Sequence, residues 1–400
     1  MNKLISLCLL FVLLFAFVAC QDEPVIPDVH VKNEAELRAA LDESGGEIIL
    51  DNDISLVSED GVSVESLVIK EGDSIILDLN GHSIMTDKTY GKNSSFLFDV
   101  KGKLVVNDSV GGSFIGGDYA NASNGAFLVD GNGTLVLNDG VVIRTYPRFK
   151  DFENKDTLKY RPASVYVRGN LVVNDARIYS SRSAIYTIDD SNVTVNGGEF
   201  YSIASVNNRQ SYVYALVLDG NACLNKCVVR GIHGALAIDG TKTVLNSGVQ
   251  AFATDDIFEK IPKEYGYKKF FEENRNEGVS PELQKTEMFY ALYCAGEREG
   301  YSAEVVVNGG RYVANNNAAY IGNSSDGGAG EKAHATIKNG TFDGGIHVDS
   351  RNPEYGFGNL IIEGGKYLKD KNTTENLNKF IKSDSGLKID DSDKDYFVVK

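Results

Sequence analysis

Aromatic side chains recur at one position of a repeated strand in the second half of the chain. Tyr293, Tyr320 and His347 each lie in the middle of a short stretch between small or aliphatic residues. If the strands of successive repeats lie side by side, the three rings stack into a stripe on the outer surface. Such a stripe could hold sugar rings through their CH faces, or it could simply stabilise the sheet by cross-strand pairing. Tyr179 and Tyr201 are expected to pair similarly on another face.

A column of carboxylates is predicted at one corner of the repeat. Asp189, Asp219 and Asp239 each end the strand that precedes the repeated phrase, as Asp130 does earlier in the chain. Carboxylates stacked about 5 Å apart repel each other, so a calcium ion could bridge them. Asp-Gly is also a common turn sequence, and it explains most of these residues without a metal. Both interpretations stay open from the sequence alone.

All these residues belong to one phrase that recurs down the chain. The phrase is a valine-rich strand, an asparagine, a turn residue, glycine or another small residue, and an aromatic or aliphatic residue two positions later. Clear copies are residues 171–178, 193–200, 305–312 and 360–367. Successive asparagines are about 20 to 36 residues apart, with one longer gap after Asn246. A repeat of this length indicates stacked structural units.

The alternation of side chains decides which stacked architecture is expected. Period-2 alternation marks short strands, and Gly, Asn and Asp mark the corners between them. No amphipathic helical segment separates the repeats, which argues against helical repeat arrays. We therefore predict an all-β fold, a single-stranded right-handed parallel β-helix (a solenoid) with an N-terminal capping helix. About ten turns spaced by about 4.8 Å would make a rod roughly 50 Å long.

The corners and ends of the solenoid carry further expectations. The recurring asparagines (Asn174, Asn196, Asn225 and Asn246) are predicted to form a structural ladder at one corner. Residues 33–36 have the pattern of a capping box, and a helix there would cover the open first turn. Leu377, Phe380 and Ile381 form an apolar cluster before a closing strand at 396–399. The solenoid domain is predicted to span residues 31–400.

Two insertions interrupt the repeat, at 146–161 and 253–287. Both combine charged and aromatic residues, and the second is expected to be partly helical. Long loops on a rigid scaffold are common places for function. A lid that packs its aromatic residues onto the wall of the solenoid is the simpler expectation for the second insertion.

Residues 1–19 have the pattern of a targeting segment, with Lys3, an apolar stretch at 4–18 and a small residue before Cys20. Residues 17–20 resemble a bacterial lipobox, except that Phe17 replaces the usual leucine. The resemblance implies cleavage before Cys20, lipid attachment to its thiol and a tether at 20–30. Residues 21–23 (Gln-Asp-Glu) resemble the surface-export signal of lipoproteins from some Gram-negative gut bacteria. We expect an outer-membrane lipoprotein facing the cell exterior, with an ordinary secretory signal as the alternative.

Charge and cysteine content limit the partners and the covalent framework. The formal charge of −16 becomes about −17 when Lys3 leaves with the signal, which argues against nucleic acid or an anionic membrane surface as the partner. Membrane contact is expected only through the lipid. Cys223, Cys227 and Cys294 are interpreted as small hydrophobic residues, with a 223–227 disulfide as the alternative.

The repeat resembles the pectate-lyase-like right-handed parallel β-helix superfamily, over roughly residues 30–400. That superfamily includes lyases, polygalacturonases and surface proteins without catalytic activity. Its catalytic signatures are largely missing here. Arg161-Pro162 lacks the second arginine of the lyase motif, and Asp189-Asp190 resembles only one of the polygalacturonase catalytic motifs, and only loosely. No catalytic residue is therefore assigned.

The opening stretch decides which of these functions is favoured. Residues 35–41, 48–54 and 76–84 resemble the start of adhesin-like β-helix proteins of bacterial surfaces. The favoured function is thus binding or adhesion, with a glycan or a host or cell-surface protein as partner and no cofactor apart from the calcium considered above. A polysaccharide lyase or glycoside hydrolase with its site under the 253–287 insertion is the alternative. A purely structural spacer is the third interpretation.

Overall fold

The computed structural model describes residues 28–43, 46–57, 64–86, 96–116, 125–145, 163–188, 190–203, 214–232, 234–240, 242–274, 290–295, 302–322, 333–348 and 359–400. The predicted signal peptide, Cys20, residues 21–27 of the predicted tether, the insertion predicted at 146–161 and Asp189 lie outside these residues. In the described part, no helix is long and apolar enough to cross a bilayer.

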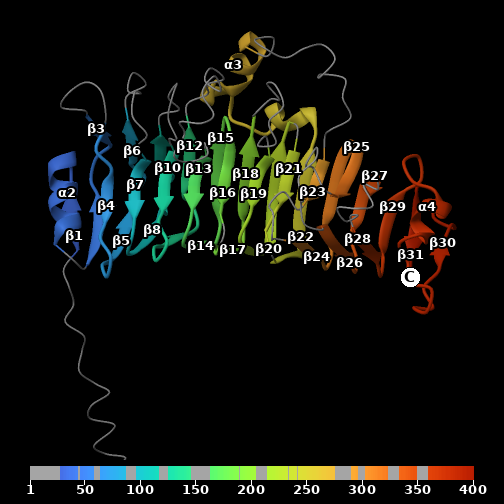
Figure 1. Cartoon of the computed structure of the whole chain (residues 1–400). Helices are drawn as coiled ribbons and strands as arrows, with labels where there is room; N and C mark the ends of the chain where they lie inside the picture. Colours follow the sequence, from blue (N-terminus) through green and yellow to red (C-terminus); the bar gives the residue numbers. More distant parts are fainter. Residues whose placement is uncertain are drawn as a thin grey trace, which may run out of the picture.

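The chain coils around one axis as a right-handed parallel β-helix (Figure 1). Each turn contributes three strands, and each strand pairs in parallel with its counterpart in the next turn, which produces three faces along the rod. The repeated valine-rich strand of the sequence forms the second face. The predicted fold class is confirmed.

Sheet 1 contains the strands that precede the repeated phrase. They are β4 (Leu67–Ile69), β7 (Phe96–Val100), β10 (Gly125–Val129), β13 (Ala163–Val167), β16 (Ser183–Thr187), β19 (Tyr214–Leu218), β21 (Gly234–Ile238), β23 (Tyr290–Ala295) and the C-terminal parts of β25 (Arg311–Gly322) and β27 (Thr341–Val348).

Sheet 2 contains the valine-rich strands of the phrase. They are β1 (Val29–Val31), β2 (Glu47–Leu50), β5 (Ser74–Asp78), β8 (Lys103–Asn107), β11 (Thr134–Leu137), β14 (Asn170–Val173), β17 (Asn192–Val195), the N-terminal parts of β20 (Asn221–Gly231) and β22 (Lys242–Ala253), β24 (Ala303–Val307), β26 (Ala333–Ile337) and β28 (Asn359–Ile362).

Sheet 3 follows the asparagine corner. Its strands are β3 (Ile54–Leu56), β6 (Ser83–Thr86), β9 (Ser113–Gly116), β12 (Val142–Thr145), β15 (Ala176–Ser180), β18 (Gly198–Ser202), the remaining parts of β20, β22, β25 and β27, and β29 (Gly365–Leu368).

The interior of the coil is filled by side chains that stack from turn to turn. Val195 and Phe200 are fully buried, as the alternation predicted. Near the C-terminal end, the ring of Phe342 lies parallel to those of Tyr312 (4.9 Å between centroids) and Tyr367 (5.4 Å). Both tyrosine hydroxyls donate to corner carbonyls three residues earlier in the chain, those of Gly309 (3.1 Å) and Gly364 (2.8 Å). A buried hydroxyl is thus satisfied within its own turn.

The predicted asparagine ladder exists and is longer than expected. Each amide donates from Nδ2 to the Oδ1 of the asparagine in the previous turn, at distances of 2.7 to 2.9 Å. The ladder joins Asn107, Asn138, Asn174, Asn196, Asn225, Asn246 and Asn308. Asparagine suits this corner because its amide is both donor and acceptor, so identical side chains can bond in series.

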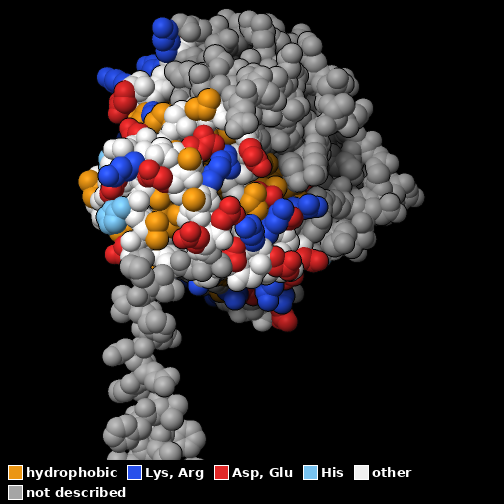
Figure 2. Space-filling view, turned by 90° about the vertical axis from the view of Figure 1, so that its left-hand side faces the viewer, with side chains coloured by type: hydrophobic (Ala, Val, Ile, Leu, Met, Phe, Trp, Pro, Cys, Tyr) orange, Lys and Arg blue, Asp and Glu red, His pale blue; other side chains and the backbone are white. Residues whose placement is uncertain are grey.

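Both ends of the coil are closed. Helix α2 (Glu34–Asp42) covers the first turn with Leu37, Ala40 and Leu41, and Asn33 caps it by accepting the N–H of Glu36 at 3.0 Å. Figure 2 views this end, where acidic and basic side chains are spread over the surface. At the other end, α4 (Thr374–Asn378) and the antiparallel strand β31 (Tyr396–Val399) close the coil. Such ends do not template edge-to-edge pairing.

The tether prediction needs one correction. Residues 29 and 30 were assigned to the tether, but they belong to β1 (Val29–Val31), which pairs with Ile48, Ile49 and Leu50 of β2. Val31 is buried beneath the capping helix. The ordered coil therefore begins two residues earlier than predicted, because these apolar residues complete the first turn of sheet 2.

Candidate ligand-binding surface

The three aromatic residues singled out on sheet 1 stack as the repeat predicted. Tyr293 pairs in register with Tyr320, and Tyr320 with His347. The ring centroids are 5.0 and 5.3 Å apart, and the interplanar angles are 13° and 12°. The spacing follows from the distance between turns, because each ring stands on the same outward position of its strand.

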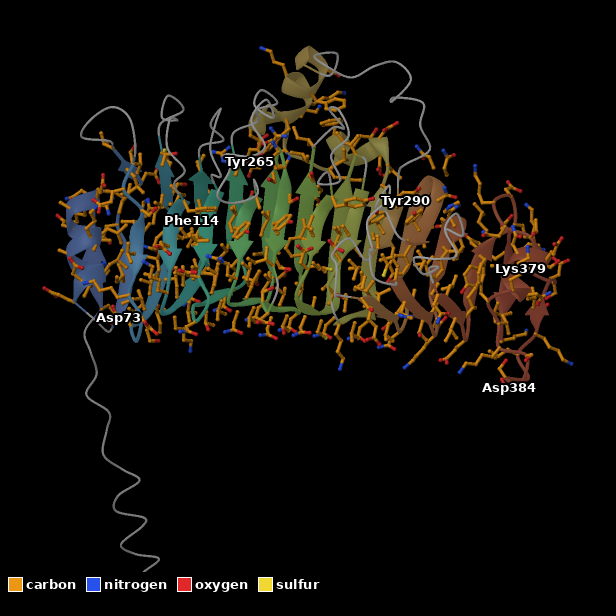
Figure 3. All side chains as sticks on the ribbon, viewed as in Figure 1. Asp73, Phe114, Tyr265, Tyr290, Lys379 and Asp384 are labelled. Carbon is orange, nitrogen blue, oxygen red and sulfur yellow. The ribbon has the colours of Figure 1, made fainter. Side chains whose placement is uncertain are left out.

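Two further tyrosines enlarge this stack, and sequence reasoning missed both. Tyr290 lies 5.9 Å from Tyr293 and 5.0 Å from Tyr320, and Tyr214 stacks on Tyr293 at 5.3 Å. Tyr214 is two turns before Tyr293, and its ring crosses the intervening turn over Gly234. We call Tyr214, Tyr290, Tyr293, Tyr320 and His347 the aromatic ladder. Figure 3 places Tyr290 at the upper edge of the coil.

Exposure differs along the aromatic ladder. Tyr214 and Tyr320 are buried to 6% and 5% exposure, and Tyr320 has neighbouring rings on three sides. Tyr293 is half-buried, and His347 is exposed. The ladder therefore combines a rigid buried base with two accessible members, which suits stacking against a ligand more than covalent chemistry.

A second aromatic group lies toward the N-terminal end of the same face. Tyr166 and Tyr186 occupy the same outward column and stack at 5.6 Å with an interplanar angle of 5°. They are only 5% and 3% exposed, so they contribute to stability and offer little surface. Both occupy the middle position of their strand, in Val165-Tyr166-Val167 and Ile185-Tyr186-Thr187, as Tyr293 does. The repeat alone could therefore have predicted that they stack.

The other predicted pair, Tyr179 and Tyr201, stacks on sheet 3 at 4.8 Å and 14°. Both rings lie beneath the second insertion, at 5% and 3% exposure. Tyr265 packs edge-on against Tyr179, and the Tyr267 hydroxyl donates to the backbone carbonyls of Tyr179 and Thr145. The pairing is confirmed, but a ligand cannot reach these faces while the insertion is in place.

The described part of the second insertion is the lid that the sequence suggested. It contains two short 3-10 helices, Asp255–Glu259 and Lys263–Tyr265, and α3 (Tyr267–Asn274). Ile257, Ile261 and Tyr267 are buried against the wall of sheet 3. The expected helical content is confirmed, and Figure 3 shows Tyr265 where the insertion meets the coil.

Charged groups beside this lid are engaged with their neighbours. Arg230 lies over the ring of Phe252 at 4.0 Å and pairs with Asp256 at 3.5 Å. The Tyr201 hydroxyl donates to Glu199, and burial followed by this carboxylate raises the pKa of Tyr201. Burial likewise raises the pKa of Tyr179 to about 12. The ion pair of Arg230 with Asp256 joins the insertion to sheet 3.

Two residues of the predicted aspartate corner, Asp219 and Asp239, lie in the turns between sheets 1 and 2. Asp219 and Asp239 follow paired strands in adjacent turns, as predicted, and the N–H of Asp239 donates to the carbonyl of Leu218 at 3.1 Å. Asp219 accepts a long hydrogen bond from the Tyr186 hydroxyl at 3.4 Å. Among the described residues, no group of three His, Cys, Asp or Glu side chains is placed to hold a metal ion. Asp189 lies outside those residues, so a calcium site that includes it stays a prediction.

The cysteines behave as small hydrophobic residues. Cys223, Cys227 and Cys294 carry free thiols, so the alternative of a 223–227 disulfide is wrong. Cys227 and Cys294 are buried inside the coil, and burial raises the pKa of Cys227 to about 12. A thiol held neutral in this way is a poor nucleophile.

Together these features define a parallel β-helix with capped ends, a fastened lid and an outward aromatic ladder. Comparison with protein-family models, curated proteins and solved structures finds no match for this chain.

Proposed function

We propose that the protein is a lipid-anchored β-helix of the bacterial cell surface that binds a neutral glycan at the accessible end of the aromatic ladder. The observation that carries the proposal is the stack of Tyr293, Tyr320 and His347, with centroid spacings of 5.0 and 5.3 Å. Its rings are nearly parallel and are held by the buried base of the ladder. A preorganised aromatic wall of this kind loses little entropy when a ligand packs on it.

Charge supports a neutral ligand. The chain carries a formal charge of −16, which repels anionic polysaccharides and nucleic acids at long range. Sugar hydroxyls have no such penalty. Because Tyr293 stacks on a ring at each face, sugar CH groups would pack against its exposed edge and against the terminal ring of His347. The lipid anchor at Cys20 and the outward-facing location follow from the resemblance of residues 17–23 to lipoprotein signals. We propose the anchor and the location together with the similarity of the coil to pectate-lyase-like and adhesin-like proteins.

The test is a glycan array probed with residues 21–400, with and without calcium, in which each hit is also checked for cleavage products. Hits are then titrated against Tyr293→Ala, His347→Ala and the control Tyr265→Ala, a half-buried tyrosine on another face. We expect binding without cleavage, weakened by roughly tenfold in the two ladder variants and unchanged in the control.

The other outcomes separate the alternatives. Cleavage would overturn the adhesion proposal in favour of a lyase or hydrolase. Binding that the ladder variants leave intact would move the site to another face. If binding strictly requires calcium, the aspartate corner becomes the candidate calcium site. If no glycan on the array binds, a protein partner or a structural spacer is favoured.

A further inference from the structure

Sheet 2 carries an unbroken column of β-branched or small apolar residues on its outer face. Each residue of the column pairs in register with the next, from one turn to the following turn. The column contains Ile76, Val105, Val136, Val172, Thr194, Cys223, Val244, Val306, Thr336 and Ile361. Ile76 is 38% exposed, and the other nine are intermediate. Outward apolar residues repeated over ten turns are unusual for a solvated sheet face.

Uncharged amides border this column over the middle of the rod. On one side is the asparagine ladder, and on the other Asn170, Asn192 and Asn221 bond in series at 3.4 and 3.3 Å. Across β11, β14, β17 and the start of β20, the three outward columns of sheet 2 contain no charged residue. In a chain with a charge of −16, this neutral patch removes the repulsion that would otherwise keep two copies apart.

Short connections border this face from β5 to β22. From β5 to β22, the strands of sheet 2 follow those of sheet 1 after two to four residues, as from Leu218 to Asn221, whereas seven to ten residues precede β24, β26 and β28. Sheet 3 follows sheet 2 through the asparagine corner after at most five residues. Up to β23, the longer connections join sheet 3 to sheet 1, and sheet 2 lines the lower edge of the coil in Figure 1. A straight, flat stripe of this length is best matched by a second flat stripe of equal length.

We propose that two copies of this chain associate face to face through sheet 2, with their rods antiparallel and the twofold axis at Thr194. This arrangement brings the apolar columns together, so that Val172 meets Cys223 and Val136 meets Val244 of the second copy. The interface is isologous and closes on itself, as most homodimer interfaces do. The proposal is independent of glycan binding on sheet 1.

Charge complementarity selects this arrangement. Counting turns from Thr194, Lys103 lies three turns before the axis and Glu304 three turns after it, in the same outward column. Asp78 and Lys338 lie four turns away in the column of the asparagine ladder. The antiparallel dimer therefore sets Lys103 against Glu304 and Asp78 against Lys338, each twice.

The parallel arrangement lacks these pairs. With the twofold axis along the rod, each turn meets the same turn of the second copy, and the two outer columns face each other. Lys338 then meets His334, and Glu304 meets Asn308. No opposite charges are brought together, so the antiparallel rods are favoured on electrostatic grounds.

The size of the face is sufficient for a specific dimer. Nine turns at about 4.8 Å give a length of roughly 40 Å, and three outward columns span roughly 18 Å with their side chains. The contact would bury about 700 Å² on each copy, or about 1,400 Å² in total, within the range of specific interfaces. An interface of this size, with one apolar column between two polar columns, is consistent with a dissociation constant in about the micromolar range.

Analytical ultracentrifugation of residues 21–400 across a concentration series tests the proposal. We expect a monomer–dimer equilibrium that Lys103→Glu and Glu304→Lys each weaken at least about tenfold, because each creates like-charge contacts. The double variant restores opposite charges and should recover the dimer. Thr194→Lys at the axis should leave a folded monomer, as circular dichroism can check. A monomer at every concentration, or charge variants without effect, would overturn the proposal.

Cross-linking tests the register separately. In a Cys223→Ser background, Thr194→Cys should be joined to itself by a short bis-maleimide, because facing sheets lie about 10 Å apart and a direct disulfide cannot span that distance. Val68→Cys, on sheet 1 and 36% exposed, is the control and should stay monomeric. Cross-linking of both cysteines, or of neither, would contradict the twofold axis at Thr194. A chain that stays monomeric while a glycan protects sheet 2 from hydrogen exchange would assign this face to that glycan.

Discussion

Gly234 makes the aromatic ladder possible, and replacing it tests the ladder directly. A Cβ at this position would lie 2.2 Å from Cδ1 and 2.3 Å from Cε1 of Tyr214. The Tyr214 ring would have to leave the sheet, although it is only 6% exposed and stacks on Tyr293. Burial of a tyrosine ring of about 150 Å² at about 25 cal/mol per Å² contributes roughly 3–4 kcal/mol. Because an expelled ring keeps part of its contacts, we expect Gly234→Ala to cost about 2–4 kcal/mol of unfolding free energy.

A double-mutant cycle identifies the cause of this loss. Denaturant unfolding is measured for the wild-type chain, Gly234→Ala, Tyr214→Ala and the double variant. Without the Tyr214 ring, the added methyl group has room, so Gly234→Ala should then change stability by less than about 0.5 kcal/mol. Gly131→Ala is the control, because nothing lies within 4 Å of its Cβ position. If the losses of unfolding free energy are additive in the double variant, a clash with the Tyr214 ring does not cause the destabilisation.

Three further predictions concern the lid, the corner and the closing strand. Tyr267→Phe removes hydrogen bonds to two buried carbonyl groups; it should cost about 1–3 kcal/mol locally and accelerate hydrogen exchange at 255–274, while the coil keeps its protection. Asn196→Ala interrupts the ladder on both sides and should lower the unfolding free energy by about 1–2 kcal/mol in chemical denaturation, with unchanged circular dichroism. The hydrogen bond to Asp343 raises the pKa of Tyr396 from 10.0 to about 12. Since the folded pKa is the higher one, this stabilisation is complete below pH 10 and is lost between pH 10 and 12. Tyr396→Phe should be less stable than the wild type below pH 10, and the difference should shrink toward pH 12; a constant difference would contradict the assignment.

Much of the fold could be predicted because one residue type recurs once per turn. The asparagines mark the same corner in seven consecutive turns, and the residues before and after them alternate between inside and outside. Val195 therefore points inward and Thr194 outward as expected. The stacking of Tyr293 on Tyr320 follows from the same register, since equal positions in neighbouring turns must be neighbours in space.

Burial of the outward residues could not be predicted in this way. Tyr166 points outward but is 5% exposed, because an outward position is covered or open according to what packs over its face. Tyr201 pairs with Tyr179 as expected, yet the insertion that covers the pair is about 60 residues later in the chain. The contact of Tyr214 with a ring two turns away also escapes a period-2 analysis, because it depends on a glycine in the turn between them.

The most direct test of the account is hydrogen–deuterium exchange of residues 21–400 with and without a saturating glycan identified on the array. If the aromatic ladder binds the glycan, exchange should slow in β23 and in the C-terminal parts of β25 and β27, the strands that carry Tyr293, Tyr320 and His347. Sheet 2 and the insertion should remain unchanged. Protection confined to residues 253–274 would contradict the aromatic ladder as the binding surface and direct attention to the lid.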